Sequence, residues 1–349
     1  MTDDVAPRKE GNGRIREDDF VLALRRIIGD GTPEVLVGAG DDGALVRVGE
    51  RVLILTVDML VEGVHFDASR VAPRDLGYKA IAVNVSDVAA MAGSPRFGLI
   101  ALAVPAGVDA PWIVELYGGM REAAGEYALS LVGGDTARAE RLTISVSVVG
   151  EVAPGGAVLR SGAQPGDRIV VTGVLGASAG GLRLAVEEPQ TIGHALGAEW
   201  ARELIAAHDR PVARVGEGQA LARYGATAMI DVSDGLALDL SRLCRESEVG
   251  AALDLERLPV APGLAELQRL LGTEPLALAL GGGEDYELLA TIPAEQASPA
   301  AEFLAERFGT PLTDIGHVRA EPGMVAVGAD GSERPLEPLG WDHFASDAG

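Results

Sequence analysis

A nearly continuous apolar stretch with a few polar interruptions occupies positions 75–91: Asp75-Leu-Gly-Tyr-Lys-Ala-Ile-Ala-Val-Asn-Val-Ser-Asp-Val-Ala-Ala-Met91. Its length predicts an α-helix, with Asp75 as the N-cap and with Gly93 and Pro95 as the stop. Because apolar residues surround the helix axis on all sides, we expect the helix to be buried. Asn84 and Asp87 are three residues apart and share a face. The stretch therefore predicts a buried helix that presents an amide and a carboxylate to the interior.

Strand and helix patterns alternate on both sides of this helix. Before a junction at 153–167, which holds four Gly and two Pro, elements are predicted at 18–28 (capped by Asp18), 35–37, 52–57, 99–104, 111–127, 129–132 and 142–149. After the junction we expect a strand at 169–172, a glycine-rich turn at 173–181, a helix starting at 182–186, a strand at 229–232 and a helix to Ser247 capped by Ser233. This order predicts an α/β (α+β) fold with a disordered arm at 1–13 and two domains, 14–152 and 153–349.

The composition excludes several classes of protein. Acidic residues number 52 against 29 basic ones, and the net charge of −23 repels nucleic acid and anionic lipid. The longest apolar run, Phe97 to Val104, is far shorter than the roughly 20 residues that span a bilayer. The single cysteine, Cys244, allows neither an internal disulfide nor a cysteine-based metal site. We therefore expect a cytoplasmic protein without nucleic-acid or membrane partners.

Seven aspartates stand at the ends of apolar segments: Asp41, Asp42, Asp58, Asp87, Asp135, Asp231 and Asp234. No cysteine or histidine lies at metal-ligand spacing from them, so oxygen-only coordination of a hard cation such as Mg²⁺ is favoured over zinc. Any single one can equally be a helix cap or a turn former. As a set they favour metal binding, because gathered carboxylates repel one another unless cations lie between them.

Two glycine-rich segments are candidates for holding phosphates, since no Gly-x-x-x-x-Gly-Lys-[Ser/Thr] loop occurs. Gly133-Gly134-Asp135-Thr136 follows a predicted strand and offers a close backbone approach. The segment 173–181 could present amide groups at a helix N-terminus. Tight turns explain the glycines of both segments equally well.

Several motifs together resemble one family. They are Gly40-Asp-Asp-Gly-Ala44, Thr56-Val-Asp-Met-Leu-Val-Glu-Gly-Val-His-Phe66, Tyr78 to Asp87, Gly133-Gly-Asp-Thr136, Arg160-Ser-Gly-Ala163, Ile230-Asp-Val-Ser-Asp-Gly-Leu236, Gly282-Gly-Glu-Asp-Tyr-Glu-Leu288 and Gly340-Trp-Asp-His-Phe344. In this order they are similar to the thiamine-monophosphate kinase family, of the wider aminoimidazole ribonucleotide synthetase and selenophosphate synthetase superfamily. The resemblance implies two α/β domains of the aminoimidazole ribonucleotide synthetase type, a homodimer whose first domains form a shared sheet or barrel, and ATP bound beside several Mg²⁺ ions.

The resemblance also implies roles for individual residues. Metal ligands would be Asp42, Thr56, Val57, Asp58, Asp87, Asp135, Asp231 and Asp234, with Val57 limited to its backbone carbonyl. ATP contacts would be Tyr117, Gly134, Asp135, Arg160 and Ser233. The thiamine phosphate pocket would contain His65, Glu284 and Trp341. Asp41 is then a turn residue, and no role is assigned to the segment 208–211.

The implied reaction is transfer of a phosphoryl group from ATP to thiamine monophosphate, which yields thiamine diphosphate and ADP. The nucleophile is a phosphate oxygen that is largely ionised at neutral pH, so no acid or base residue is needed and positioning and charge neutralisation dominate. Two alternatives stay open at this point. One is another ATP-dependent synthetase of the superfamily, of the selenophosphate or aminoimidazole ribonucleotide type. The other is a non-catalytic regulator that binds divalent cations or nucleotide.

Overall fold

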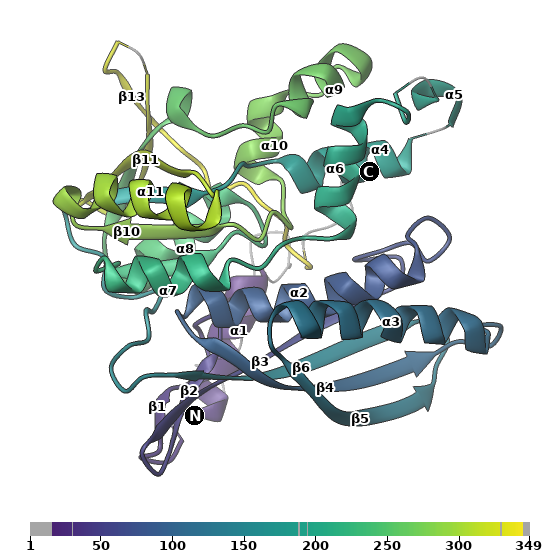
Figure 1. Cartoon of the computed structure of the whole chain (residues 1–349). Helices are drawn as coiled ribbons and strands as arrows, with labels where there is room; N and C mark the ends of the chain where they lie inside the picture. Colours follow the sequence, from purple (N-terminus) through teal and green to yellow (C-terminus); the bar gives the residue numbers. More distant parts are fainter. Residues whose placement is uncertain (1–15, 30, 188, 194, 329, 345–349) are drawn as a thin grey trace.

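The computed structural model describes residues 16–29, 31–187, 189–193, 195–328 and 330–344, so the arm predicted at 1–13 lies outside the described residues. Each half of the chain forms one β-sheet with helices packed on it (Figure 1). This arrangement confirms the predicted α/β fold with two domains. Among the described residues, no helix is both long and apolar enough to cross a membrane.

The first sheet has six strands in the order β1-β2-β3-β6-β4-β5. Their bounds are β1 Val35–Val37, β2 Ala44–Val48, β3 Arg51–Val61, β4 Ser94–Val104, β5 Ser130–Arg138 and β6 Thr143–Val152. All neighbours pair antiparallel except β4 and β5, which are parallel. In this order β5 is an edge strand, and β4 and β6 lie between it and β3.

Two helices, α2 (Pro73–Ala90) and α3 (Ala110–Glu126), cover one face of the first sheet (Figure 1). They approach closely at two glycines: a Cβ at Gly77 would lie 1.9 Å from the Leu116 carbonyl oxygen, and one at Gly119 would lie 1.7 Å from that of Arg74. α2 is buried along most of its length, as predicted from its sequence. It begins at Pro73 rather than Asp75, because proline suits the first turn of a helix.

The second sheet has seven strands in the order β13-β12-β9-β11-β7-β10-β8. These strands are β7 Arg168–Thr172, β8 Ala228–Asp231, β9 Gly250–Asp254, β10 Leu288–Ile292, β11 Leu312–Arg319, β12 Gly323–Val327 and β13 Glu333–Pro335. Around them lie α4 Ala177–Val186, α5 Pro189–Ile192, α6 Glu199–Asp209, α7 Val215–Arg223, α8 Leu236–Glu246, the 3₁₀ turn Leu255–Arg257, α9 Gly263–Leu271, α10 Pro275–Gly281 and α11 Ala294–Phe308. One core packs α8 against this sheet, and another packs α7 and α11 on it.

The first helix, α1 (Glu17–Ile28), makes ion pairs with the second domain rather than with the first sheet. Asp18 lies 3.2 Å from the Nε of Arg242, and Arg25 Nη1 lies 3.2 Å from Glu246. Asp18 therefore does not cap α1 as predicted. The helix starts after Arg16, which makes no side-chain cap bond, and the Asp18 carboxylate serves tertiary contacts instead.

Several element boundaries differ from the sequence-based predictions, and three of them bear on the predicted site segments. β3 continues through Asp58 to Val61, because its whole length pairs with β6. β5 continues through the Gly133–Thr136 motif to Arg138, because pairing with β4 outweighs the poor strand propensity of glycine. α4 begins at Ala177, within the segment predicted to be a turn, after Gly176 in a left-handed conformation.

Candidate active site

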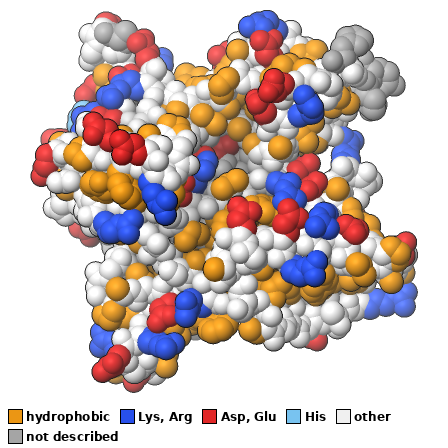
Figure 2. Space-filling model, viewed as in Figure 1, with side chains coloured by type: hydrophobic (Ala, Val, Ile, Leu, Met, Phe, Trp, Pro, Cys, Tyr) orange, Lys and Arg blue, Asp and Glu red, His pale blue; other side chains and the backbone are white. Residues whose placement is uncertain are grey.

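A cavity of about 1340 Å³ lies between the two domains, with α1 and the segment around Trp341 also on its wall. One part of its wall is acidic and carries most of the predicted metal ligands. Another part is apolar and is lined by Val64, Leu182, Val186, Leu196 and Ile205. The cavity can therefore receive a ligand with a highly charged end and an organic end. Figure 2 shows acidic and basic side chains close together where the two halves of the molecule meet. Ion pairs also join the two domains, since Arg210 pairs with Asp75 and Glu122.

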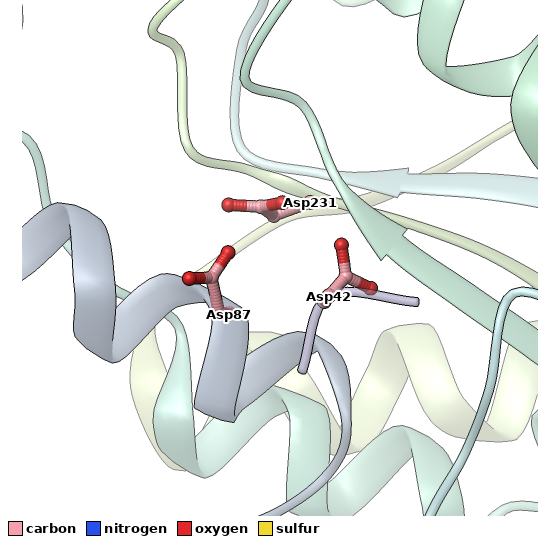
Figure 3. A group of neighbouring side chains, drawn as sticks. All are labelled: Asp42, Asp87 and Asp231. Carbon is pink, nitrogen blue, oxygen red and sulfur yellow. The ribbon is translucent and has the colours of Figure 1, made fainter. Parts of the chain in front are cut away.

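The acidic part centres on Asp42, Asp87 and Asp231, whose nearest carboxylate oxygens all lie within 4.8 Å of one another. Figure 3 shows these carboxylates facing a common space from a loop, a helix and a strand. Asp42 comes from the loop between β1 and β2, Asp87 from α2, and Asp231 from the last position of β8. Segments that are far apart in the sequence thus converge, as the aspartate pattern predicted.

Short hydrogen bonds orient these carboxylates. Thr56 Oγ1 donates to Asp87 Oδ2 over 2.5 Å, and Ser86 Oγ donates to Asp231 Oδ2 over 2.6 Å. Asn84 uses its side-chain oxygen to accept the backbone N–H of Asp58 over 2.8 Å. The polar residues of α2 therefore anchor this helix to β3 in its own domain and to β8 in the other.

The acid cluster (Asp42, Asp58, Asp87, Asp231 and Asp234) lacks enough positive charge. Burial and repulsion by neighbouring aspartates raise the pKa of Asp87 and of Asp231 well above the usual value, and raise the pKa of Asp58 to about 6. Asp42 Oδ2 is the one buried side-chain oxygen without a hydrogen-bond partner among the described residues. An acceptor without a partner beside other carboxylates fits a bound divalent cation.

Two arginines contact the acid cluster from its sides. Arg160 Nη2 donates to Asp42 Oδ1 over 2.6 Å, and Arg242 Nη1 donates to Asp234 Oδ2 over 2.5 Å. Arg160, predicted to contact ATP, thus lies beside the predicted metal ligands. Arg242 was not singled out in the sequence, since an arginine inside an amphipathic helix carries no distinctive signal.

The loop that carries Ser233 and Asp234 is shaped by Asp239. Its carboxylate oxygen Oδ2 accepts the N–H groups of Ser233, Asp234 and Gly235 at 3.0 to 3.1 Å. The prediction that Ser233 caps the following helix is therefore wrong: α8 starts at Leu236, after Gly235, and the capping acceptor comes from within the helix. Both Ser233 and Asp234 line the cavity.

The predicted residues of the thiamine phosphate pocket also line the cavity. Glu284 lies 3.0 Å from Lys79 Nζ and 3.2 Å from His208 Nδ1, and Lys79 contributes most to lowering its pKa, against the effect of burial, to about 2. His65 accepts the Val61 N–H at its Nδ1 over 3.1 Å. The His65 ring lies 5.0 Å from that of His343, whose Nδ1 accepts the indole N–H of Trp341 over 3.2 Å.

Three predicted ATP contacts do not join this cavity. Tyr117 lines a separate groove on α3, and neither Gly134 nor Asp135 lies on the cavity wall. Asp135 pairs with Ala101 on β4, which pairs with Ser145 on β6, which pairs with Met59 on β3. Asp135 is thus three strand spacings, ~14 Å, from β3 within one chain.

Lys79, Ser86, His208 and Asp239 are site residues that sequence reasoning did not assign. Ser86 and Lys79 fell within quoted motifs, and a lysine in an otherwise apolar helix signals a buried partner. His208 and Asp239 gave no such signal, because their partners depend on the tertiary fold.

Comparison with known proteins gives consistent matches along the chain. Residues 40–152 match the N-terminal domain, and residues 164–328 the C-terminal domain, of the AIR synthase related proteins. The thiamine-monophosphate kinase of Bacillus subtilis (strain 168) is 39% identical over 311 residues, which cover 88% of this chain and 93% of the relative. The corresponding kinase of Aquifex aeolicus (strain VF5) is 37% identical over 305 residues, covering 87% and 92%.

Solved structures agree with this result. The structure of AaThiL complexed with AMPPCP and TMP superposes with a TM-score of 0.81 at 34% identity, and the match covers 94% of this chain and 97% of that one. The hydrogenase maturation protein HypE matches with a TM-score of 0.66 at 21% identity, which shows a shared fold alone. By its sequence matches over most of its length, this chain belongs to the thiamine-monophosphate kinase family, within the AIR synthase related proteins.

Proposed function

We propose that this protein phosphorylates thiamine monophosphate with ATP and forms thiamine diphosphate and ADP. The proposal rests on one observation: the acid cluster and the carboxylate of Glu284 line the same cavity. A polyphosphate bridged by cations matches the first, and a cationic thiazolium ring matches the second. Relatives 39% identical over about nine-tenths of the chain carry the same activity in their names.

The residues of the acid cluster fit Mg²⁺, which takes carboxylate, hydroxyl and carbonyl oxygens. Asp42, Asp58, Asp87, Asp231 and Asp234 would hold it, together with the hydroxyl of Thr56 and the carbonyl of Val57. Bound there, the metal would neutralise phosphate charge during an in-line transfer. The number of acids suits more than one ion.

The remaining groups position the two substrates. The attacking phosphate oxygen needs no base, because it is largely ionised at neutral pH. Arg160, whose guanidinium already lies against Asp42, would offer its forked donors to ATP phosphate oxygens beside the metal. Ser233, on the neighbouring loop, would contact the same nucleotide. At the organic end, His65, Glu284 and Trp341 would surround the thiamine rings, with Glu284 opposite the positive ring.

We also propose a homodimer formed through the first sheet. The face of this sheet opposite α2 and α3 exposes large apolar side chains, among them Val57 at 60%, Met59 at 54%, Phe97 at 48% and Leu99 at 48%. A second copy of the chain would cover this face. The strand register places Asp135 in the same row as Met59 and Ala101, so Gly134 and Asp135 would also lie at the interface. Gly134 and Asp135 would then serve ATP only in the dimer.

The dimer is tested by sedimentation equilibrium of the wild type and of Phe97→Asp/Leu99→Asp. The wild type is expected to sediment at twice the chain mass and the variant as a folded monomer with little kinase activity. A monomeric wild type would rule out the dimer, and a fully active monomeric variant would remove the proposed role of Gly134 and Asp135.

The activity is tested by incubating the protein with ATP and Mg²⁺ and either thiamine monophosphate or free thiamine, followed by chromatographic identification of the products. Thiamine diphosphate is expected only from the monophosphate. ADP formation no higher than without substrate would refute the proposal. Diphosphate formed from free thiamine would assign a different acceptor.

A further inference from the structure

The motif Gly283–Glu287 separates its three acids into different environments. Glu284 and Tyr286 have left-handed backbones, with φ of 65° and 52°, and their N–H groups donate to Ser233 and Val232. Asp285 turns to the start of α4, where it accepts the N–H of Gly176 over 2.6 Å. Glu287 pairs with Arg214 at 2.6 Å. Of the three acids, only Glu284 lines the cavity.

Two basic side chains approach Glu284 from opposite domains. Lys79 comes from α2, and its Nζ lies 3.0 Å from each carboxylate oxygen. His208 comes from α6, and its Nδ1 lies 3.2 Å from Glu284 Oε2 and 3.1 Å from the hydroxyl of Ser178. Glu284 is thus held from both walls of the cavity.

The three side chains differ in how much of their surface is exposed. The Lys79 side chain is 2% exposed and that of His208 9%, whereas that of Glu284 is 21% exposed. Lys79 and His208 also lie on the cavity wall, but a ligand in the cavity would meet mainly the Glu284 carboxylate, which is the most exposed of the three groups. A lysine this deeply buried requires a partner, and Glu284 is the partner it contacts.

We propose that Lys79 and His208 are positioning residues that fix the Glu284 carboxylate for the positively charged ring of the substrate. This inference rests on the proposed function, since it takes the organic cation to be the ligand at Glu284. Lys79 and Asp87 are eight residues apart on α2, which is ~12 Å along the helix axis. One rigid helix thereby sets the separation between the site for the organic ring and the site for the phosphates.

The test measures binding of thiamine monophosphate alone by titration calorimetry, with neither ATP nor Mg²⁺ present. Lys79→Met and His208→Gln are compared with the wild type and with His317→Gln, a matched control on an exposed position of β11. Both site variants are expected to weaken binding roughly 10- to 100-fold, as is typical when a group that orients a ligand-binding side chain is lost. In kinetic assays their KM for thiamine monophosphate should rise while the KM for ATP and kcat stay close to wild type.

A double-mutant cycle separates positioning from direct contact. If Lys79 acts through Glu284, then adding Lys79→Met to Glu284→Gln should weaken binding no further. The double variant also removes both charges of the pair together, so it keeps a folded reference if Lys79→Met alone does not fold. Independent, additive losses would overturn the proposal by showing that Lys79 contacts substrate directly. Wild-type affinity in folded Lys79→Met and His208→Gln would overturn it as well.

The two proposals fail in different ways. Wild-type protein that forms no thiamine diphosphate would refute the proposed function, whatever the variants do. An active wild type whose affinity for the monophosphate is insensitive to Lys79 and His208 would refute only the positioning role.

Discussion

The two charged parts of the cavity both contain carboxyl groups, but their pKa values are shifted in opposite directions. In the acid cluster, burial and neighbouring aspartates raise the pKa of Asp58 to about 6 and raise the pKa of Asp87 well above its usual value. At the organic end, Lys79 and His208 lower the pKa of Glu284 to about 2, although it too is withdrawn from water. The difference lies in whether the protein itself supplies the compensating cations.

This contrast indicates which half of the site is complete without ligands. Glu284 has Lys79 and His208 as partners within the fold, so its geometry is set before substrate arrives. The acid cluster has only Arg160 and Arg242 against five aspartates, and one oxygen of Asp42 lacks a partner. We propose that metal ions bring the missing positive charge together with the nucleotide.

The largest expected effect is the loss of catalysis in Asp231→Asn. Removing a metal-holding carboxylate should lower kcat about 1,000-fold, or about 4 kcal/mol in activation free energy. The comparison variant is Asp109→Asn, which keeps an N-cap acceptor for α3 outside the cavity and should remain active. Steady-state rates at limiting Mg²⁺ check this, and near-normal turnover of Asp231→Asn would remove this residue from the metal site.

A second effect concerns the stability of the protein at low pH. Because the folded pKa of Glu284, about 2, lies below its usual 4.5, its ion pairs stabilise the protein above pH 4.5 and this contribution is lost as pH falls toward 2. Glu284→Gln should therefore lower the unfolding free energy by about 3 kcal/mol at pH 7 and by less at pH 3.

Urea unfolding from pH 3 to 8 measures this difference. Glu321→Gln, whose side chain is 75% exposed, is the control and should match the wild type. A pH-independent difference for Glu284→Gln would contradict the ionic origin of the effect.

A third substitution should raise the stability of the protein instead of lowering it. The folded pKa of Asp58, about 6, lies above the usual 3.8, so the unfolded chain binds fewer protons between these values and stability is lost as pH rises through 6. Without divalent ions, Asp58→Asn should be more stable than wild type by about 3 kcal/mol at pH 8, with no gain near pH 4. The same urea series in EDTA checks this, and destabilisation at pH 8 would show that the acid cluster is not under charge strain.

The smallest effect comes from metal binding itself. Mg²⁺ at ten times its Kd should stabilise the wild type by ~1.4 kcal/mol, because it binds only the folded chain. Asp87→Asn should lose most of this gain. Thermal unfolding with and without Mg²⁺ measures it, and an equal gain in both proteins would place the ion elsewhere.

The sequence predicted the acid cluster better than the groups around it. Asp42, Asp87 and Asp231 stand beside strands or on a helix with a strong apolar pattern, so their place in the fold follows from local rules. The contact of Lys79 with Glu284 spans 205 residues and depends on how the domains pack, which local patterns do not encode. Likewise, Gly133 to Thr136 were expected to end a strand, but pairing with β4 keeps them extended. The metal, ATP and substrate roles of individual residues stay predictions.

The burial of α2 has a practical consequence for protein engineering. This helix carries Lys79 near its middle and Ser86 and Asp87 near its C-terminal end, and most of its residues are buried. A combinatorial library that alters it would disturb catalysis, recognition and folding at once. Efforts to accept a different heterocycle should instead diversify Leu182, Val186, Leu196 and Ile205, which line the apolar wall and lie apart from the charged framework.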